Sequence, residues 1–294
     1  MFTQKNFYSS PASRYLMLLL AWMLCTIIGS FVMALVMGDG TQTGRMRIAI
    51  VVQDILMFIL PALLTAVFIT SRPAELLGVT RRFPPSALLL VFMIMVVSAP
   101  AMNILISFNQ SLTLPESLKP IEEWMRHSEE SAAHSLSLVT GSTSVGSLII
   151  SILIVGILAG FSEEIFFRGA LQRIMATGGV SAHAAIWIAA FIFSAFHMQF
   201  FGFLPRLLLG AFFGYLLWWS GSLWLPVCAH ALNNTMALIL EWQRQRQGAR
   251  VTLDASLSDN PDFASWCIIL LGVVLAAWMI ITLRWRLKKA AAKR

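Results

Sequence analysis

The sequence predicts an all-α membrane protein, a polytopic helical bundle of about eight transmembrane helices. Of its 294 residues, 58% are hydrophobic and only 12% are charged, whereas a soluble globular domain has about 25% charged residues. Apolar stretches that approach the ~20 residues needed to cross a ~30 Å hydrocarbon core recur along the chain. The basic residues gather at the ends of these stretches and in the tail, so the net charge of +7 indicates membrane topology and not nucleic-acid binding.

The apolar stretches predict one span after another along the whole chain. They are Tyr15 to Met37, Ile48 to Thr70, Ser86 to Phe108, Val145 to Arg168, Ala184 to Phe201, Leu204 to Ser220, Leu223 to Glu241 and Ala264 to Leu287. We divide the chain into residues 1–144, with three helices and an acidic loop, residues 145–241, with the next four helices, and residues 242–294, with a loop, the last helix and a basic tail. The middle region is the predicted functional core.

The distribution of positive charge predicts the orientation of the spans. With the N-terminus inside, 13 of the 21 Lys and Arg residues fall on inner segments, which suits the positive-inside rule. Both termini should then face the cytoplasm. The longest connection, Asn109 to Ser144, is acidic and is predicted to be a solvated outer loop in which His127 and His134 are surface residues. The apolar surroundings of Cys25, Cys228 and Cys267 predict buried side chains, not disulfides or metal ligands.

Several polar side chains fall within the middle region of the chain, although an ionisable group in the hydrocarbon layer costs about 2.5 to 3.5 kcal/mol. They are Glu163, Glu164, Arg168, His197, His230 and Asn234. Glu164 and Arg168 are four residues apart and can form an ion pair on one helix face, while Glu163 is rotated by about 100°. The alternative is that these three residues only extend to the membrane interface.

A helical hairpin predicts the neighbour of Glu163. Gly178 and Gly179 interrupt the helical pattern, and Glu163 and His197 each lie 17 residues from residue 180. In two antiparallel helices joined there, the carboxylate and the imidazole come to equal depth and can meet inside the membrane. The alternative for His197 is an ordinary core histidine.

Two further pairs of polar residues have alternative interpretations. His230 and Asn234 are four residues apart on one face, where they can hold an oxyanion or merely link helices by hydrogen bonds. Counting along straight helices places His230 too close to the turn near Gly221, so Pro226 or an interfacial stretch after Arg168 must correct its depth. Asp54 and Arg206 are near-membrane charges that can pair with each other, which we favour, and the alternative is a second functional site.

Three ordered motifs resemble the CPBP intramembrane peptidases, a family that includes CAAX prenyl proteases and bacterial Abi proteins. The family's EExxxR pattern occurs from Glu163 to Arg168, its FxxxH pattern from Phe193 to His197, and its HxxxN pattern from His230 to Asn234. Each motif is weak alone, but all three occur in order and within apolar spans. The resemblance covers about Val145 to Glu241, roughly a third of the chain.

The resemblance implies an intramembrane endopeptidase that cuts membrane-associated peptides or proteins. Glu163 and His197 would activate the attacking water, and His230 and Asn234 would stabilise the oxyanion, because preorganised donors gain strength where bulk water is excluded. Glu164, Arg168 and Phe193 would support the site. No cofactor is expected. The alternative is zinc bound by Glu163, His197 and His230, but the chain has no HExxH motif.

Two other functions fit the same residues. In a proton-coupled transporter, Glu163, His197 and Asp54 would relay protons, although the sequence shows no repeated halves with broken helices. In a non-catalytic scaffold or immunity protein, the motifs would serve packing alone. The expected location is the bacterial cytoplasmic (inner) membrane, and the expected partners are a peptide or protein substrate and the lipid bilayer.

Overall fold

The structure, a computed structural model, describes residues 10–37, 43–247 and 262–292, and every regular element in these ranges is a helix. Helices occupy all eight predicted positions, so the prediction of a polytopic helical bundle is confirmed. Six helices in the described ranges are long and apolar enough to cross a membrane. They are Pro11–Leu35, Thr43–Ile69, Pro85–Ser111, Val145–Thr177, Phe200–Ser220 and Phe263–Ala290. The bundle therefore has the form of an integral membrane protein.

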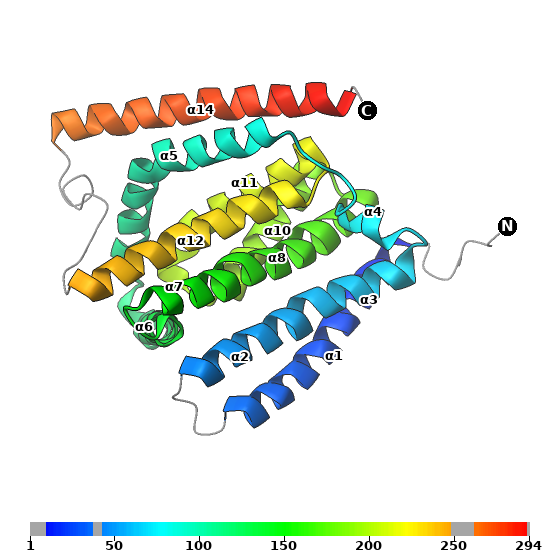
Figure 1. Cartoon of the computed structure of the whole chain (residues 1–294), viewed down its shortest axis with the longest axis horizontal. Coiled ribbons are helices and arrows are strands. Elements are labelled where there is room, and N and C mark those ends of the chain that lie inside the picture. The colour runs from blue at the N-terminus through cyan, green and yellow to red at the C-terminus, as the bar shows by residue number, and fades with distance from the viewer. Residues whose placement is uncertain (1–9, 38–42, 248–261, 293–294) are drawn as a thin grey trace.

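The N-terminal helices form one side of the bundle. Helix α1 (Pro11–Met37) is followed by a continuous helix made of α2 (Thr43–Gln53), the π-helical segment η2 (Asp54–Ile59) and α3 (Leu60–Ile69). A short α4 (Pro73–Leu77) leads to α5 (Pro85–Ser111), which is bent in Figure 1 and contains Pro100. Proline removes a backbone N–H and clashes with the preceding turn, which explains a bend within this helix.

The predicted acidic loop is mainly a helix. After a short 3₁₀ turn, η3 (Glu116–Leu118), residues Lys119–Thr140 form α6, which is seen nearly end-on in Figure 1 and so runs across the direction of the spans. The acidity of this segment predicts a loop, but its apolar residues recur at helical spacing, which gives one face of a helix. His127 and His134 are exposed on this helix, as expected. At its start, hydrogen bonds from the Leu114 N–H and from Arg126 hold the pKa of Glu122 below its ordinary value.

The central helix is longer than predicted. It comprises α7 (Val145–Ser151), η4 (Ile152–Leu158), α8 (Ala159–Glu164), η5 (Ile165–Gln172) and α9 (Arg173–Thr177), of which η4 and η5 are π-helical. The sequence placed Arg168 at the end of this span, but the helix continues to Thr177 and the Arg168 side chain is fully buried. Extension of Arg168 to the membrane interface is therefore excluded. Single π-helical turns within α-helices often occur at functional sites.

The remaining helices complete the core. Gly178 and Gly179 form the predicted turn, with Gly179 at φ 98°, and α10 (Ala182–Phe196) follows. A 3₁₀ turn, η6 (Phe200–Gly202), leads to α11 (Phe203–Ser220), which reverses at Gly221 into α12 (Trp224–Gln247). The predicted spans at α10 and α12 are helices, but α10 has only 15 residues and α12 carries polar side chains, so neither meets the criteria for a spanning helix.

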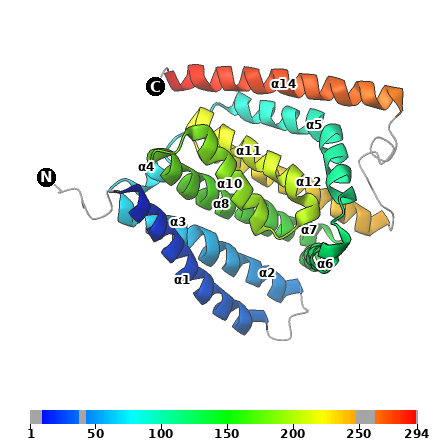
Figure 2. The same ribbon diagram turned by 180° about the vertical axis from the view of Figure 1, so that it is seen from behind.

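The functional core is enclosed by outer helices. Figures 1 and 2 show α8, α10, α11 and α12 in the middle, with α1 to α3 on one side and α5 with α14 (Phe263–Ala292) on the other. The outermost helices expose large apolar residues, including Phe31, Leu35 and Ile281, which suits contact with lipid tails. Cys25 is buried as predicted, whereas Cys267 is exposed among these apolar residues. Buried positions therefore concentrate around the middle helices.

Candidate active site

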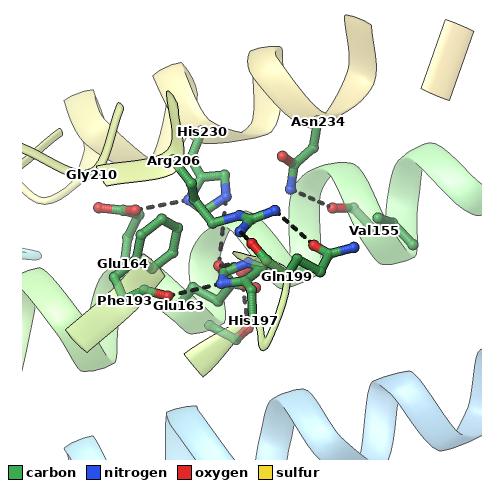
Figure 3. Close-up of polar contacts among 12 residues, drawn as sticks. Val155, Glu163, Glu164, Phe193, His197, Gln199, Arg206, Gly210, His230 and Asn234 are labelled. Atoms are coloured by element: carbon green, nitrogen blue, oxygen red, sulfur yellow. Dashed lines mark hydrogen bonds and ion pairs between the residues drawn. The ribbon is translucent and has the colours of Figure 1, made fainter. Parts of the chain in front are cut away.

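Glu163 meets two histidines from separate helices. Its Oε2 atom lies 3.9 Å from Nε2 of His197, at the end of α10, and 3.6 Å from Nε2 of His230, on α12. These separations are too long for direct hydrogen bonds, but one water molecule about 2.8 Å from each atom could bridge them. The predicted meeting of Glu163 and His197 is present, and His230 lies beside the same carboxylate (Figure 3).

The other ring nitrogens fix the histidine tautomers. Nδ1 of His197 lies 2.8 Å from the carbonyl oxygen of Phe193, which can only accept, so Nδ1 carries the hydrogen. Nδ1 of His230 lies 2.8 Å from Oε1 of Glu164 and donates to that carboxylate. In the neutral rings both Nε2 atoms are then acceptors, and Oε2 of Glu163 has no hydrogen-bond partner. Three acceptor atoms therefore converge with no protein donor between them.

Glu164 and Arg168 form the predicted ion pair at the base of the site. Nη1 of Arg168 lies 2.7 Å from Oε1 of Glu164, and both side chains are fully buried. Nη2 of Arg168 donates to the Gly210 carbonyl of α11 at 2.9 Å. Glu164 thus has a second partner that its sequence position did not reveal, since it also holds His230. The pair connects three helices and orients one imidazole.

Aromatic rings hold the two imidazoles between them. Phe193 makes an edge-on contact with His197 at 4.9 Å between ring centroids and another with His230 at 5.7 Å. Phe213 stacks on His230 at 5.1 Å, and the guanidinium of Arg168 lies 4.4 Å from the centre of the Phe193 ring. The expected packing of Phe193 beside His197 is present. The chain turns sharply after His197 because Met198 adopts a left-handed conformation, φ 53°.

Asn234 lies near this group but has its own partner. Its Nδ2 donates to the Val155 carbonyl of η4 at 3.0 Å (Figure 3). Asn234, His197 and His230 all line a cavity of about 310 Å³, to which α6 contributes Glu129 and α11 contributes Arg206. Residues outside the three motifs therefore also line the cavity.

The expected pairing of Asp54 with Arg206 is wrong. Asp54 is buried, accepts a hydrogen bond from Ser162 Oγ at 3.0 Å and interacts electrostatically with Glu163. Arg206 instead donates to Gln199, at 3.2 Å to the backbone oxygen and 2.7 Å to Oε1. The two charges sit in different spans, and the depth of a residue alone does not tell which sides of two helices face each other.

The residues of this site do not form a recognisable metal-binding group. Among the described residues, no three His, Cys, Asp or Glu side chains are arranged to hold a metal ion.

Close contact between α8 and α12 sets the position of His230. A Cβ atom on Gly160 would lie 3.1 Å from the Ala231 backbone nitrogen, next to His230. Gly160→Val should force α12 away and lower the free energy of unfolding by about 1 to 3 kcal/mol, the usual cost of overpacking. Thermal denaturation in detergent measures this effect. Gly146→Val is the control, since nothing lies within 4 Å of a Cβ there; equal behaviour of the two variants would contradict the prediction.

Comparison with known proteins finds one protein family that part of the chain resembles. Residues 145–236 match the family model for Rce1-like proteins, described as type II CAAX prenyl endopeptidase Rce1-like. This region matches the CPBP/CAAX protease family. The match covers about a third of the chain and stops before α14. No curated protein and no solved structure matches the chain.

The matched region contains all the candidate residues that the motifs predicted. Glu163, His197, His230 and Asn234 lie within residues 145–236, whereas Asp54 and Glu129 lie outside. Sequence reasoning missed Gln199, Glu129 and the true partners of Asp54 and Arg206. For Gln199 a signal was present, since it follows His197 by two residues and precedes the break at η6. For Glu129 there was none, because its contact with the cavity depends on how α6 folds back.

Proposed function

We propose that this protein is an intramembrane endopeptidase that hydrolyses a peptide bond in a membrane-associated peptide or protein. The observation that carries the proposal is the convergence of three acceptor atoms, Glu163 Oε2 and the Nε2 atoms of His197 and His230, beside a cavity. A water molecule can donate its two hydrogens to such acceptors and present an oxygen lone pair to a carbonyl. The match to an endopeptidase family supports the same reaction.

In the proposed mechanism Glu163 is the general base. Water is held between Glu163 Oε2 and His197 Nε2, whose separation of 3.9 Å suits one bridging molecule. Its oxygen bonds to the carbonyl carbon of the substrate, its proton passes to Glu163, and the carbonyl π electrons move to the oxygen. When the carbon–nitrogen bond breaks, Glu163 returns the proton to the leaving nitrogen. Products are a carboxylic acid and an amine.

The proposed oxyanion donors are His230 and Asn234. Asn234 has a second Nδ2 hydrogen beyond the one given to Val155. His230 already donates from Nδ1 to Glu164, so it can donate from Nε2 only as an imidazolium. The Glu164 carboxylate, whose Oε1 lies 2.8 Å from His230 Nδ1, is the counter-ion of that imidazolium. His230 and Glu164 would thus act together as the negative charge develops.

The proposed location is the bacterial cytoplasmic membrane, with both termini in the cytoplasm. The basic residues at the end of α14 support this orientation through the positive-inside rule. The substrate would reach the cavity from the bilayer or its surface. A proton-coupled transporter has less support, because Glu163, His197 and His230 group at one place in the bundle.

Cleavage of a membrane-peptide library by the detergent-purified full chain tests the proposal, with mass spectrometry to locate new termini. We expect a recurring cleavage position in peptides with apolar segments. If the peptides stay intact and proteoliposomes show a proton flux that depends on Glu163, the protein is a proton-coupled transporter and this proposal fails. If the folded protein shows neither cleavage nor proton flux, the remaining function is that of a non-catalytic scaffold.

Metal removal gives a separate prediction. Because the described residues form no metal-binding group, we expect cleavage to survive thorough chelation with little change in rate. The measurement compares initial rates before and after treatment with a chelator and dialysis. Loss of cleavage that zinc restores would instead assign Glu163, His197 and His230 as ligands.

A further inference from the structure

While His230 is neutral, the oxyanion in the proposed reaction has only one weak donor among the motif residues. His230 gives its Nδ1 hydrogen to Glu164, which leaves Nε2 an acceptor in the neutral ring. Asn234 gives one amide hydrogen to Val155. A single remaining N–H of a neutral amide is little stabilisation for a full negative charge, whereas hydrogen bonds from charged donors are roughly twice as strong. A cationic donor in the same cavity would complete the site.

Arg206 is such a cation. It lines the same cavity as His197, His230 and Asn234, and its guanidinium interacts electrostatically with both His197 and Glu163. Figure 3 shows its side chain among those of the site, coming from α11. The one arginine of the three motifs, Arg168, does not reach this cavity, because it is fully buried and lies against the Phe193 ring.

The partners of Arg206 hold it in place without neutralising it. Both of its hydrogen bonds go to Gln199, one to the backbone oxygen and one to the side-chain oxygen, and both acceptors are uncharged. Glu129 also lines the cavity, and both Glu129 and Glu163 interact electrostatically with Arg206. In the described part of the chain, however, neither carboxylate forms a direct ion pair with the guanidinium. A guanidinium has five N–H donors, so several remain for a ligand. Its geometry is preorganised while its charge stays available.

We infer that Arg206 is a catalytic residue that donates from its guanidinium to the carbonyl oxygen of the substrate as that oxygen becomes negative. This inference rests on the proposed endopeptidase function. As the water oxygen bonds to the carbonyl carbon, the π electrons move onto the carbonyl oxygen, and an Arg206 N–H stabilises the charge. The contact weakens when the carbonyl re-forms and the carbon–nitrogen bond breaks. Arg206 keeps its proton throughout.

The test compares kinetic constants of Arg206→Gln, Arg206→Lys and the wild type on the peptide found by library screening. Loss of an oxyanion donor typically lowers kcat about 10²- to 10³-fold, so we expect this loss in Arg206→Gln with KM nearly unchanged. Arg206→Lys keeps the positive charge and should therefore recover part of the lost kcat. Arg72→Gln is the matched control, because Arg72 is an exposed arginine on a surface ion pair with Glu75.

A binding experiment keeps the inference testable without turnover. A peptide phosphonate carries a negative tetrahedral oxygen at the position of the oxyanion, and we expect Arg206→Gln to bind it at least tenfold more weakly than Arg72→Gln does, at equal thermal stability. A rise in KM with unchanged kcat would show that Arg206 binds an anionic group of the substrate and would overturn the inference, as would unchanged kinetics. If Glu163→Gln also cleaves normally, or the wild type neither cleaves nor binds the phosphonate, the endopeptidase function itself fails.

Discussion

Glu163→Gln should reduce peptide cleavage about 10²- to 10⁴-fold, the usual contribution of a general base. Gln has nearly the same shape as Glu, but its amide cannot take a proton from water at neutral pH. In addition, the amide nitrogen would place a donor where three acceptors now converge, so the bound water would be turned or displaced. Initial rates on a cleavable membrane peptide, measured at equal concentrations of folded protein, give the comparison.

The first control for Glu163→Gln is the thermal stability of the variant. The Glu163 Oε2 atom has no hydrogen-bond partner and its side chain is 15% exposed, so its replacement should leave the melting temperature unchanged or slightly higher. A second control is Glu123→Gln, which removes an exposed carboxylate on α6. Cleavage by Glu163→Gln at more than a tenth of the wild-type rate would rule out Glu163 as the base.

Arg168→Met should lower the free energy of unfolding by about 3 to 5 kcal/mol, the effect of removing one partner from a buried ion pair. The substitution leaves the fully buried Glu164 carboxylate without its 2.7 Å partner and the Gly210 carbonyl without its donor. It also removes a cation from the face of Phe193, which contacts both imidazoles. Thermal and denaturant unfolding in detergent measure the loss.

A double-mutant cycle with Glu164→Gln separates the ion pair from general packing. Without Arg168 the negative charge of Glu164 is the main cost, so the double variant should be more stable than Arg168→Met alone. Arg126→Met is the matched arginine control, since its ion pair with Glu122 is partly exposed and should contribute no more than about 1 kcal/mol. Equal losses in the two single arginine variants would contradict the prediction.

Local sequence rules predicted those contacts that lie within one helix. The pair of Glu164 and Arg168 follows from a spacing of four residues, and the turn at Gly178 and Gly179 follows from helix-breaking residues. The hairpin also brought Glu163 near His197, because equal distance from a turn means equal depth in antiparallel helices. By contrast, the second role of Glu164 as the partner of His230 depends on how α12 rotates about its axis.

Local sequence rules do not predict contacts between helices that are distant in the sequence. Asp54 and Arg206 were paired by charge and depth, yet Asp54 bonds to Ser162 and Arg206 to Gln199. The π-helical segments η2 and η5 shift which side chains share a face, and straight α-helical counting does not include that shift. The same counting placed His230 near the inner turn, whereas it lies beside Glu163 and Glu164.

The sequence alone determined the membrane class, the positions of the helices and the set of motif residues, because apolar length and local spacing are properties of consecutive residues. Tertiary structure decided which polar groups meet. It oriented His230 through Glu164, engaged the amide of Asn234 with Val155 and brought Arg206 to the same cavity. The physical reason is that burial and hydrogen bonding between separate helices depend on how the helices rotate and pack. Close contacts such as that of the Ala231 backbone with Gly160 set this packing.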